Sequence, residues 1–119
     1  MKIPDKVKVK QRADQIKFKK IRIVSSNYKI TYHDVVRDDD GKILEGRIIE
    51  ALKEILIDKN LNYQTMLQVI LHEVMHGIKW EMCFDIKDEN INTQLTTGIT
   101  CFIRDNPEFI VEYMRVFNN

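Results

Sequence analysis

Two histidines, His72 and His76, stand four residues apart, and Glu73 follows the first of them. On a helix, residues four apart lie on one face with their Cβ atoms about 5–6 Å apart, so both imidazoles can reach one tetrahedral metal ion. Glu73 is rotated by about 100° from His72, which directs its carboxylate beside the ion and not at it. The arrangement predicts a Zn²⁺ site in which Glu73 takes a proton from the metal-bound water as that water attacks a carbonyl carbon.

The alternative interpretation is a helix that carries two histidines with no joint role. The chain has only three histidines, and two of them occupy this spacing inside an otherwise apolar helix. Burying two imidazoles and a carboxylate without partners would cost about 1–3 kcal/mol for each unsatisfied group, which favours a metal site. The third histidine, His33, falls in a strand pattern and is expected to be a surface or half-buried residue, not a ligand.

A catalytic zinc ion has three protein ligands and leaves the fourth position to water, so one more ligand is needed. Candidate carboxylates follow the helix at Glu81, Asp85, Asp88 and Glu89. Glu81 is expected to point away from the metal, and Asp85 and Asp88 fall in the connection to the next helix. Glu89 begins that helix and could face the first helix across an antiparallel pair. We favour Glu89 over Asp88, and its alternative role is a carboxylate placed for the helix dipole.

In the elements that position these residues, the apolar residues recur first with the period of strands and later in the chain with that of helices. Residues 21–36 predict a hairpin around a turn at 25–27, and 38–41 form a second turn. Residues 43–57 fit either a helical stripe or two short strands. Helices are predicted over 63–80, with Asn62 as the N-cap, over 89–104, and from Pro107 onward. The whole chain, 1–119, is predicted to form a single domain.

Composition narrows the class of protein further. The 119 residues are 44% hydrophobic and 31% charged, which is typical of one soluble globular domain. Nine lysines and arginines fall within the first 22 positions, but the net charge is only +1, so we do not expect a nucleic-acid partner. No stretch has the length of a membrane span or the pattern of a signal peptide. The two cysteines, Cys83 and Cys101, are expected to be reduced thiols, which predicts a cytoplasmic location.

The motif HEVMHG at residues 72–77, followed by Glu89, resembles the small gluzincin-type metallopeptidases, in which a glutamate ligand lies on the helix after the HExxH helix. More closely, the chain resembles the short phage- and prophage-encoded relatives of the ImmA/IrrE group, over residues 21–32, 46–58, 67–77 and 89–107. The resemblance implies a small antiparallel sheet packed beside the active-site helix, which decides for strands in 43–57. It also implies that residues 55–58 form the edge strand along which an extended peptide substrate lies.

One feature departs from the larger members of that group. No His, Tyr or Arg is clearly placed to stabilise the oxyanion, and the candidates Tyr32, Tyr63 and Tyr113 are not ranked. The prediction is therefore an α+β protein with a minimal zincin-like fold, in which a small antiparallel sheet from the N-terminal half packs on the HExxH helix and two further C-terminal helices follow.

The predicted function is zinc-dependent peptide hydrolysis, with His72, His76 and Glu89 as zinc ligands and Glu73 as the general base. The alternatives are a catalytically inactive or regulatory zincin-fold protein of phage or prophage origin that binds a protein partner through its sheet edge, and a metal-sensing module. Glu73 favours the enzyme, because a structural or sensory zinc needs no carboxylate beside it and usually closes its fourth position with a protein ligand.

Overall fold

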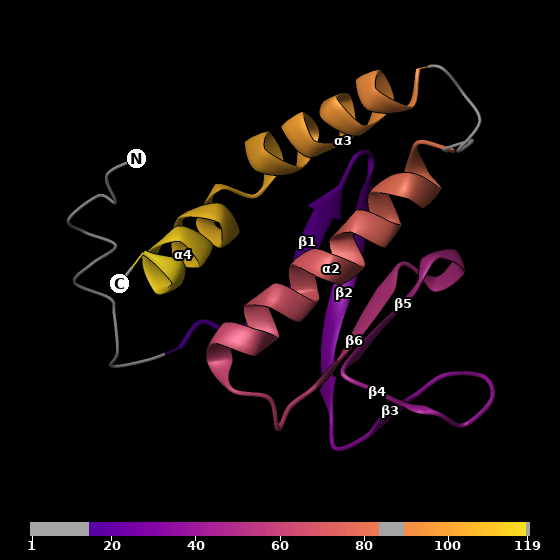
Figure 1. The fold of residues 1–119 in the computed structure, drawn as a ribbon, viewed down its shortest axis with the longest axis vertical. Helices are drawn as coiled ribbons and strands as arrows, with labels where there is room; N and C mark the ends of the chain where they lie inside the picture. The colour runs from indigo at the N-terminus through magenta and orange to yellow at the C-terminus, as the bar shows by residue number, and fades with distance from the viewer. Residues whose placement is uncertain (1–14, 84–89, 119) are drawn as a thin grey trace.

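The structure, a computed structural model, describes residues 15–83 and 90–118, so the basic residues at positions 2–12 and the predicted ligand Glu89 lie outside it. A four-stranded sheet lies against three helices (Figure 1). The elements are β1 (Lys20–Ile23), β2 (Ser26–His33), β3 (Val36–Arg37), β4 (Ile43–Leu44), β5 (Gly46–Ile49), the 3-10 turn η1 (Glu50–Leu52), β6 (Glu54–Asp58), α2 (Tyr63–Glu81), α3 (Ile91–Asp105) and α4 (Pro107–Phe117). The predicted α+β class is confirmed.

The sheet has the strand order β1-β2-β6-β5, and its central pair, β2 and β6, is parallel. The expectation of an antiparallel sheet is therefore wrong for this pair, although β1–β2 and β5–β6 are antiparallel. The chain between His33 and Glu54 makes the difference possible, because it exceeds the dozen or so residues that a parallel connection requires. It passes through the β3–β4 hairpin, β5 and η1 before β6 enters beside β2.

Residues 43–57 form strands and not a helix, as the resemblance implied. Gly46 pairs with Ile57 and Ile49 pairs with Glu54 around η1. The predicted edge strand is wrong, however, because β6 lies between β2 and β5. Ile55 and Ile57 are fully buried there, as expected for an inner strand. The free edge on this side of the sheet belongs to β5.

The first hairpin turns slightly earlier than predicted, at residues 24 and 25. Ser26 and Asn27 already pair with Ile23 and Arg22, so they belong to β2. Val24 takes a φ of 56°, a left-handed conformation in which it closes the tight turn.

Helix α2 is the central element and ends within one residue of its predicted boundary. The side chain of Asn62 accepts a hydrogen bond of 2.9 Å from the backbone N–H of Thr65, which caps the helix as expected. Gly77 lets the helix approach the sheet, because a Cβ there would lie only 2.7 Å from Cδ1 of Ile23. Buried side chains of α2, Leu67 and Val74 among them, form the core with the sheet.

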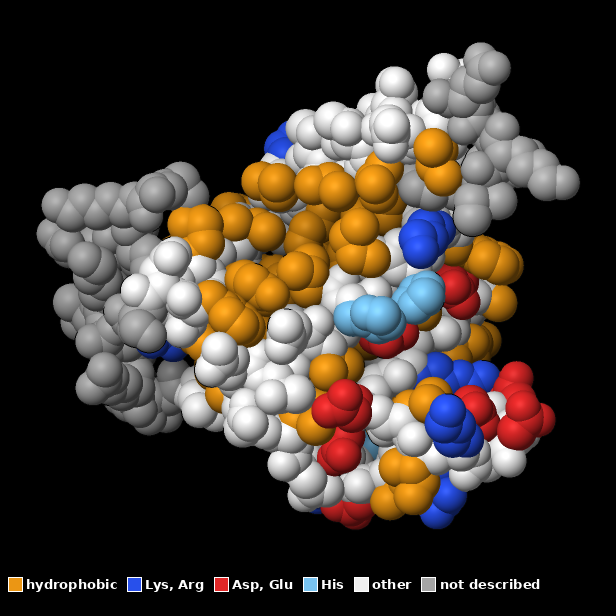
Figure 2. Space-filling model, viewed as in Figure 1, with side chains coloured by type: hydrophobic (Ala, Val, Ile, Leu, Met, Phe, Trp, Pro, Cys, Tyr) orange, Lys and Arg blue, Asp and Glu red, His pale blue; other side chains and the backbone are white. Residues whose placement is uncertain are grey.

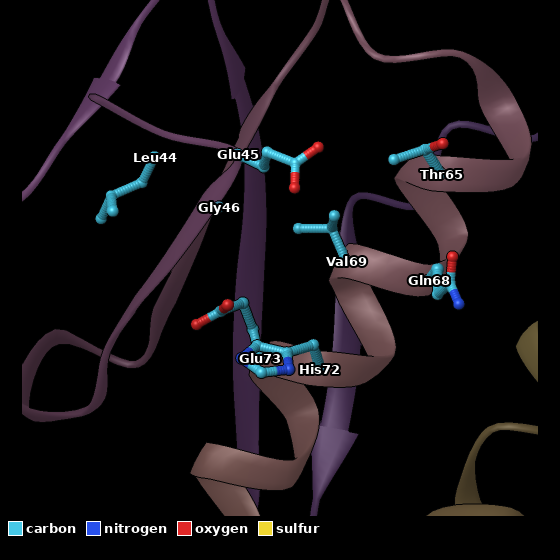
Figure 3. A pocket seen from close by; sticks show the side chains of 8 residues that line it. All are labelled: Leu44, Glu45, Gly46, Thr65, Gln68, Val69, His72 and Glu73. Carbon is cyan, nitrogen blue, oxygen red and sulfur yellow. The ribbon is translucent and has the colours of Figure 1, made fainter.

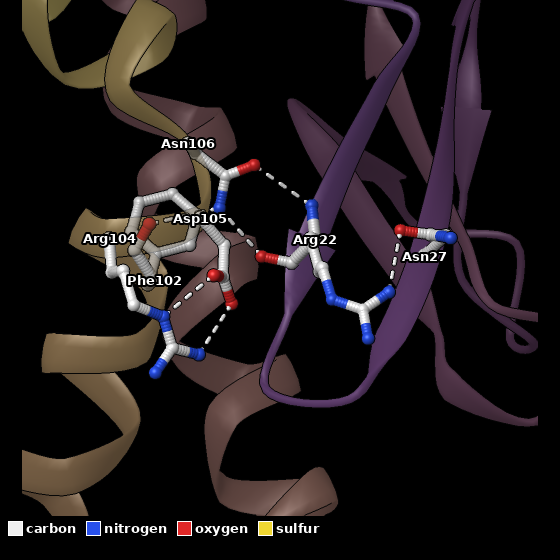
Figure 4. A network of polar contacts seen from close by, with 6 residues as sticks. All are labelled: Arg22, Asn27, Phe102, Arg104, Asp105 and Asn106. Carbon is white, nitrogen blue, oxygen red and sulfur yellow. Dashed lines mark hydrogen bonds and ion pairs between the residues drawn. The ribbon is translucent and has the colours of Figure 1, made fainter.

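Helices α3 and α4 meet at Asn106, which also covers the outer edge of β1 (Figure 4). The backbone N–H of Arg22 donates to Oδ1 of Asn106 at 2.9 Å, and Nδ2 of Asn106 donates to the Arg22 carbonyl at 2.7 Å. Pro107 opens α4, as predicted. The side-chain amide thus replaces a neighbouring strand at one residue of β1. Within the described ranges, no helix is long and apolar enough to cross a membrane.

Candidate metal centre

His72 and His76 lie together on the exposed face of α2, and their Nε2 atoms are 3.2 Å apart. Two nitrogens bound to a tetrahedral zinc ion at 2.0–2.1 Å would be about 3.3–3.4 Å apart, so the pair fits two adjacent ligand positions. The same distance also allows one N–H···N hydrogen bond when no ion is bound. Figure 2 shows histidine side chains side by side at the surface, with acidic side chains close by.

The exposure of both imidazoles corrects one step of the sequence argument. The apolar sequence of α2 predicts that both side chains are buried, but the apolar residues turn toward the sheet and the other helices, which leaves the histidine face open. The cost of burial therefore applies to Glu73 alone. The hypothesis of a metal site now depends on the geometry of the Nε2 atoms of His72 and His76.

Glu73 is buried, with 7% of its surface exposed, and its carboxylate is directed toward β5 (Figure 3). Burial raises the pKa of this carboxyl, while the nearby His72 and His76 and the backbone N–H of Ile48 partly oppose the rise. The side chain is thus offset from the ligand face, as the rotation along the helix predicted. A carboxyl with a raised pKa is better suited to accept a proton than an ordinary surface glutamate.

A groove of about 420 Å³ runs between the edge strand β5 and α2, and His72 and Glu73 contribute to its wall. It is lined by Leu44, Glu45, Gly46, Thr65, Gln68, Val69, His72 and Glu73 (Figure 3). Its volume lies in the range of small-molecule and peptide-side-chain sites. The helical members share one face of α2 through their spacing of three and four residues, a signal that could have been read from the sequence. Glu45 joins them only through the tertiary fold.

The β5 edge presents backbone groups beside this groove. The N–H of Asp58 donates to the carbonyl of Glu45 at 2.9 Å, which makes these two residues a hydrogen-bonded pair. Because such pairs alternate along an antiparallel ladder, Gly46 and Ile48 direct their N–H and C=O groups away from β6. The Ile48 N–H is close enough to the Glu73 carboxyl to lower its pKa. The edge strand and the acid are therefore parts of one site.

The third ligand is not found in residues 15–83 or 90–118, where no group of three His, Cys, Asp or Glu side chains comes together to hold a metal. Glu89, Asp88 and Asp85 all lie outside the described residues. Glu81 is described and points away, as expected. The assignment of Glu89 therefore stays a prediction.

Glu81 is held by partners on other elements. Its carboxylate accepts hydrogen bonds from Ser26 at 2.8 Å and from Tyr28 at 2.7 Å, and it pairs with Lys53. These contacts tie the end of α2 to the first hairpin and to the residue after η1. The carboxylate is thus committed to the fold and cannot also serve as a metal ligand in this arrangement.

The three tyrosines considered as oxyanion donors do not line the groove. The hydroxyl of Tyr32 donates to the backbone carbonyl of Phe18 at 2.7 Å, and that of Tyr63 donates to Glu112 at 2.6 Å. Tyr113 packs within the aromatic cluster of α4. Of the side chains that do line the groove, Thr65 and Gln68 carry neutral donors.

The remaining candidates behave as expected from their surroundings. His33 is half-buried, and its Nε2 shares a hydrogen bond of 2.7 Å with the hydroxyl of Thr31. Cys83 and Cys101 are both free thiols. None of these side chains belongs to the groove.

No protein-family model, curated protein or solved structure matches this chain. The class of protein is therefore defined by the fold and the geometry of the site. It is an α+β protein with an exposed histidine pair on its central helix, beside a buried glutamate and an open sheet edge.

Proposed function

We propose that this protein is a zinc-dependent peptide hydrolase in which His72 and His76 bind the ion and Glu73 is the general base. The observation that carries the proposal is the separation of 3.2 Å between the two Nε2 atoms, with a buried carboxylate next to His72. A purely structural zinc site needs no such carboxylate. An isolated histidine pair would not be accompanied by a groove whose wall includes both His72 and Glu73.

Zinc, when bound, would polarise the substrate carbonyl and lower the pKa of a coordinated water to about 7. The contribution of the chain itself is the carboxylate of Glu73. It accepts a proton from the attacking water and then passes it to the amine that leaves, so one peptide bond and one water give a carboxylate and an amine. The nearby backbone N–H of Ile48 lowers the pKa of this carboxyl and so partly offsets the effect of burial.

The groove and the β5 edge would take the substrate as an extended peptide. The outward N–H and C=O groups of Gly46 and the outward C=O of Ile48 can pair with the peptide backbone, as in strand addition to a free sheet edge. This moves the expected substrate strand from residues 55–58 to β5, which is the strand next to the histidines. The α2 side of the groove would contact the substrate side chains.

Two parts of the proposal depend on the sequence. We propose Glu89 as the third ligand, with Asp88 as the alternative. We also propose a cytoplasmic location, because Cys83 and Cys101 are free thiols and two unpaired cysteines are common in reducing compartments.

Replacing Glu73 with glutamine tests the proposal. The amide keeps the size of the side chain but cannot accept the proton, so cleavage of an unbiased peptide library, read by mass spectrometry, should fall by about 10²–10⁴-fold. Zinc content should stay at the wild-type level, because Glu73 is offset from the ligand face. The melting temperature should hold or rise, because a buried carboxylate costs more than an amide.

Identical cleavage by the wild type and Glu73→Gln would overturn the assignment of the base. If neither protein cleaves any peptide while both hold zinc and bind a common partner, the proposed peptidase function is wrong and a regulatory zincin-fold protein is favoured. If zinc binding depends on His72 and His76 but no peptide is hydrolysed, a metal-sensing module is also favoured.

A further inference from the structure

Glu45 is an exposed residue in the link between β4 and β5, and its carboxylate projects from the link toward the α2 wall of the groove (Figure 3). Among the described residues, no side chain pairs with this carboxylate. The cation next to it on β5, Arg47, is already bound to Asp39 at 2.7 Å. Glu45 therefore brings an unbalanced negative charge into the groove.

The charges along the groove are unevenly distributed. Its charged lining consists of Glu45 and Glu73, with His72 as the remaining titratable side chain and no lysine or arginine. A zinc ion at the histidines would offset the charge of Glu73, which lies beside them. Glu45 would keep its full negative charge, which favours a cation in its part of the groove.

The position of Glu45 along the groove follows from its neighbour Gly46. A Cβ at Gly46 would lie 2.5 Å from Cγ1 of Val69, so this part of the strand is level with Val69 on the helix. Val69 is one helical turn, about 5–6 Å, before Glu73. That spacing corresponds to about two residues of extended peptide at roughly 3.3 Å each.

We infer that Glu45 selects a lysine or arginine side chain within about two residues of the cleaved bond. The inference rests on the proposed function for the position of that bond. The ammonium or guanidinium group would pair with the Glu45 carboxylate. The aliphatic stem would pack on Val69, the apolar side chain that faces Glu45 from α2 (Figure 3).

The test uses decapeptides of Ala, Gly and Ser in which Lys, Arg, Gln or Glu is placed at each position in turn. Cleavage is measured with the zinc-loaded wild type, and binding is measured by fluorescence anisotropy with zinc-loaded Glu73→Gln. We expect Lys or Arg to be preferred at one position by about five- to tenfold, and the preference should weaken as salt is added.

Three single substitutions distinguish the effect of the charge at Glu45 from that of the overall charge of the protein. Glu45→Gln should remove the preference for a basic side chain, and Glu45→Lys should move it to Glu. Glu108→Gln is the matched control, because Glu108 is an exposed glutamate on α4 and lies outside this groove. It should leave the preference unchanged.

The outcomes distinguish this inference from the proposed function. In one outcome no peptide is cleaved, but Glu73→Gln binds basic peptides and the double variant Glu73→Gln/Glu45→Gln does not. The proposed hydrolysis is then wrong, while the selection of a basic side chain by Glu45 is confirmed. If Glu45→Gln keeps the wild-type preference, the role of Glu45 is overturned even where cleavage is confirmed. Peptides that are neither cleaved nor bound, or bound without regard to charge, also overturn it.

Discussion

His72 and His76 are exposed on α2, so replacing either one removes few packing contacts. Their joint effect should therefore be on the metal and not on the fold. We predict about one zinc per chain after purification without chelator, and its loss in His72→Ala and His76→Ala. With zinc removed from all three proteins, the free energy of unfolding should agree within about 0.5 kcal/mol. Native mass spectrometry and urea unfolding give the two readings.

The chain offers a matched control in its third histidine. His33 bonds Thr31 on the sheet and does not line the groove, so His33→Ala should keep its zinc. A wild type that cannot be loaded with zinc would remove the metal centre. Equal zinc loss in all three variants would show that the metal binds histidines without regard to the α2 pair.

At the scale of elements, the connection between α2 and α3 carries the predicted third ligand. Glu89→Gln should weaken zinc binding by more than about 100-fold, because the loss of even an outer partner of a ligand costs 10–100-fold. Asp88→Asn and Asp85→Asn should change the affinity little. Competition with a chelator of known affinity measures all three, and equal losses would leave no basis for choosing Glu89.

The contacts of Glu81, which fix the end of α2 to the sheet, make the stability of the protein depend on pH. Burial raises the pKa of Glu81, but the hydrogen bonds from Lys53, Tyr28 and Ser26 outweigh it and hold the pKa below the ordinary value of 4.5. A carboxyl whose pKa is lower in the folded state stabilises the fold above its unfolded pKa. This stabilisation is lost as the pH falls from 4.5 through the folded value.

Glu81→Gln should therefore destabilise the protein by about 1–3 kcal/mol at pH 7, where the ionised carboxylate is the acceptor. The difference from the wild type should shrink below pH 4.5, as the wild type loses the same charge. Urea unfolding across this range measures it, and Glu108→Gln serves as an exposed control. A deficit that is constant with pH would mean that packing, and not the ionised carboxylate, holds the end of α2.

At the scale of the whole molecule, the two edges of the sheet are treated differently. Asn106 covers part of β1, whereas β5 is open beside the groove. We predict that Asn106→Ala lowers stability by about 1–3 kcal/mol, since it leaves two backbone groups of Arg22 without their partner. The variant should also self-associate more than the wild type as the protein concentration rises, because the β1 edge is newly exposed. Thermal unfolding and gel filtration at two concentrations measure these effects.

Asn27→Ala is the matched control for that prediction. Asn27 also bonds Arg22, at 3.2 Å, but it does so through the exposed guanidinium and not through the strand backbone. Its loss should change stability by less than about 0.5 kcal/mol. If both variants behave alike, the coverage of the β1 edge contributes nothing beyond an ordinary surface contact.

The sequence by itself determined the features that depend on one element. The helical period of 3.6 residues places His72 and His76 on the same face and turns Glu73 away from it, whatever the rest of the chain does. The cap at Asn62 and the break before Pro107 are equally local, and both are found where they were predicted. Short-range geometry is enough for all of these because each involves residues only a few positions apart.

The tertiary structure alone decided the features that depend on distant segments. The place of β6 inside the sheet and the parallel pairing with β2 follow from which strands come together, which no period of a single strand encodes. The exposure of the histidines and the approach of Glu45 to α2 follow from the same packing. An inner strand and an edge strand differ in the strands that pair with them, and those partners can lie far away in the chain.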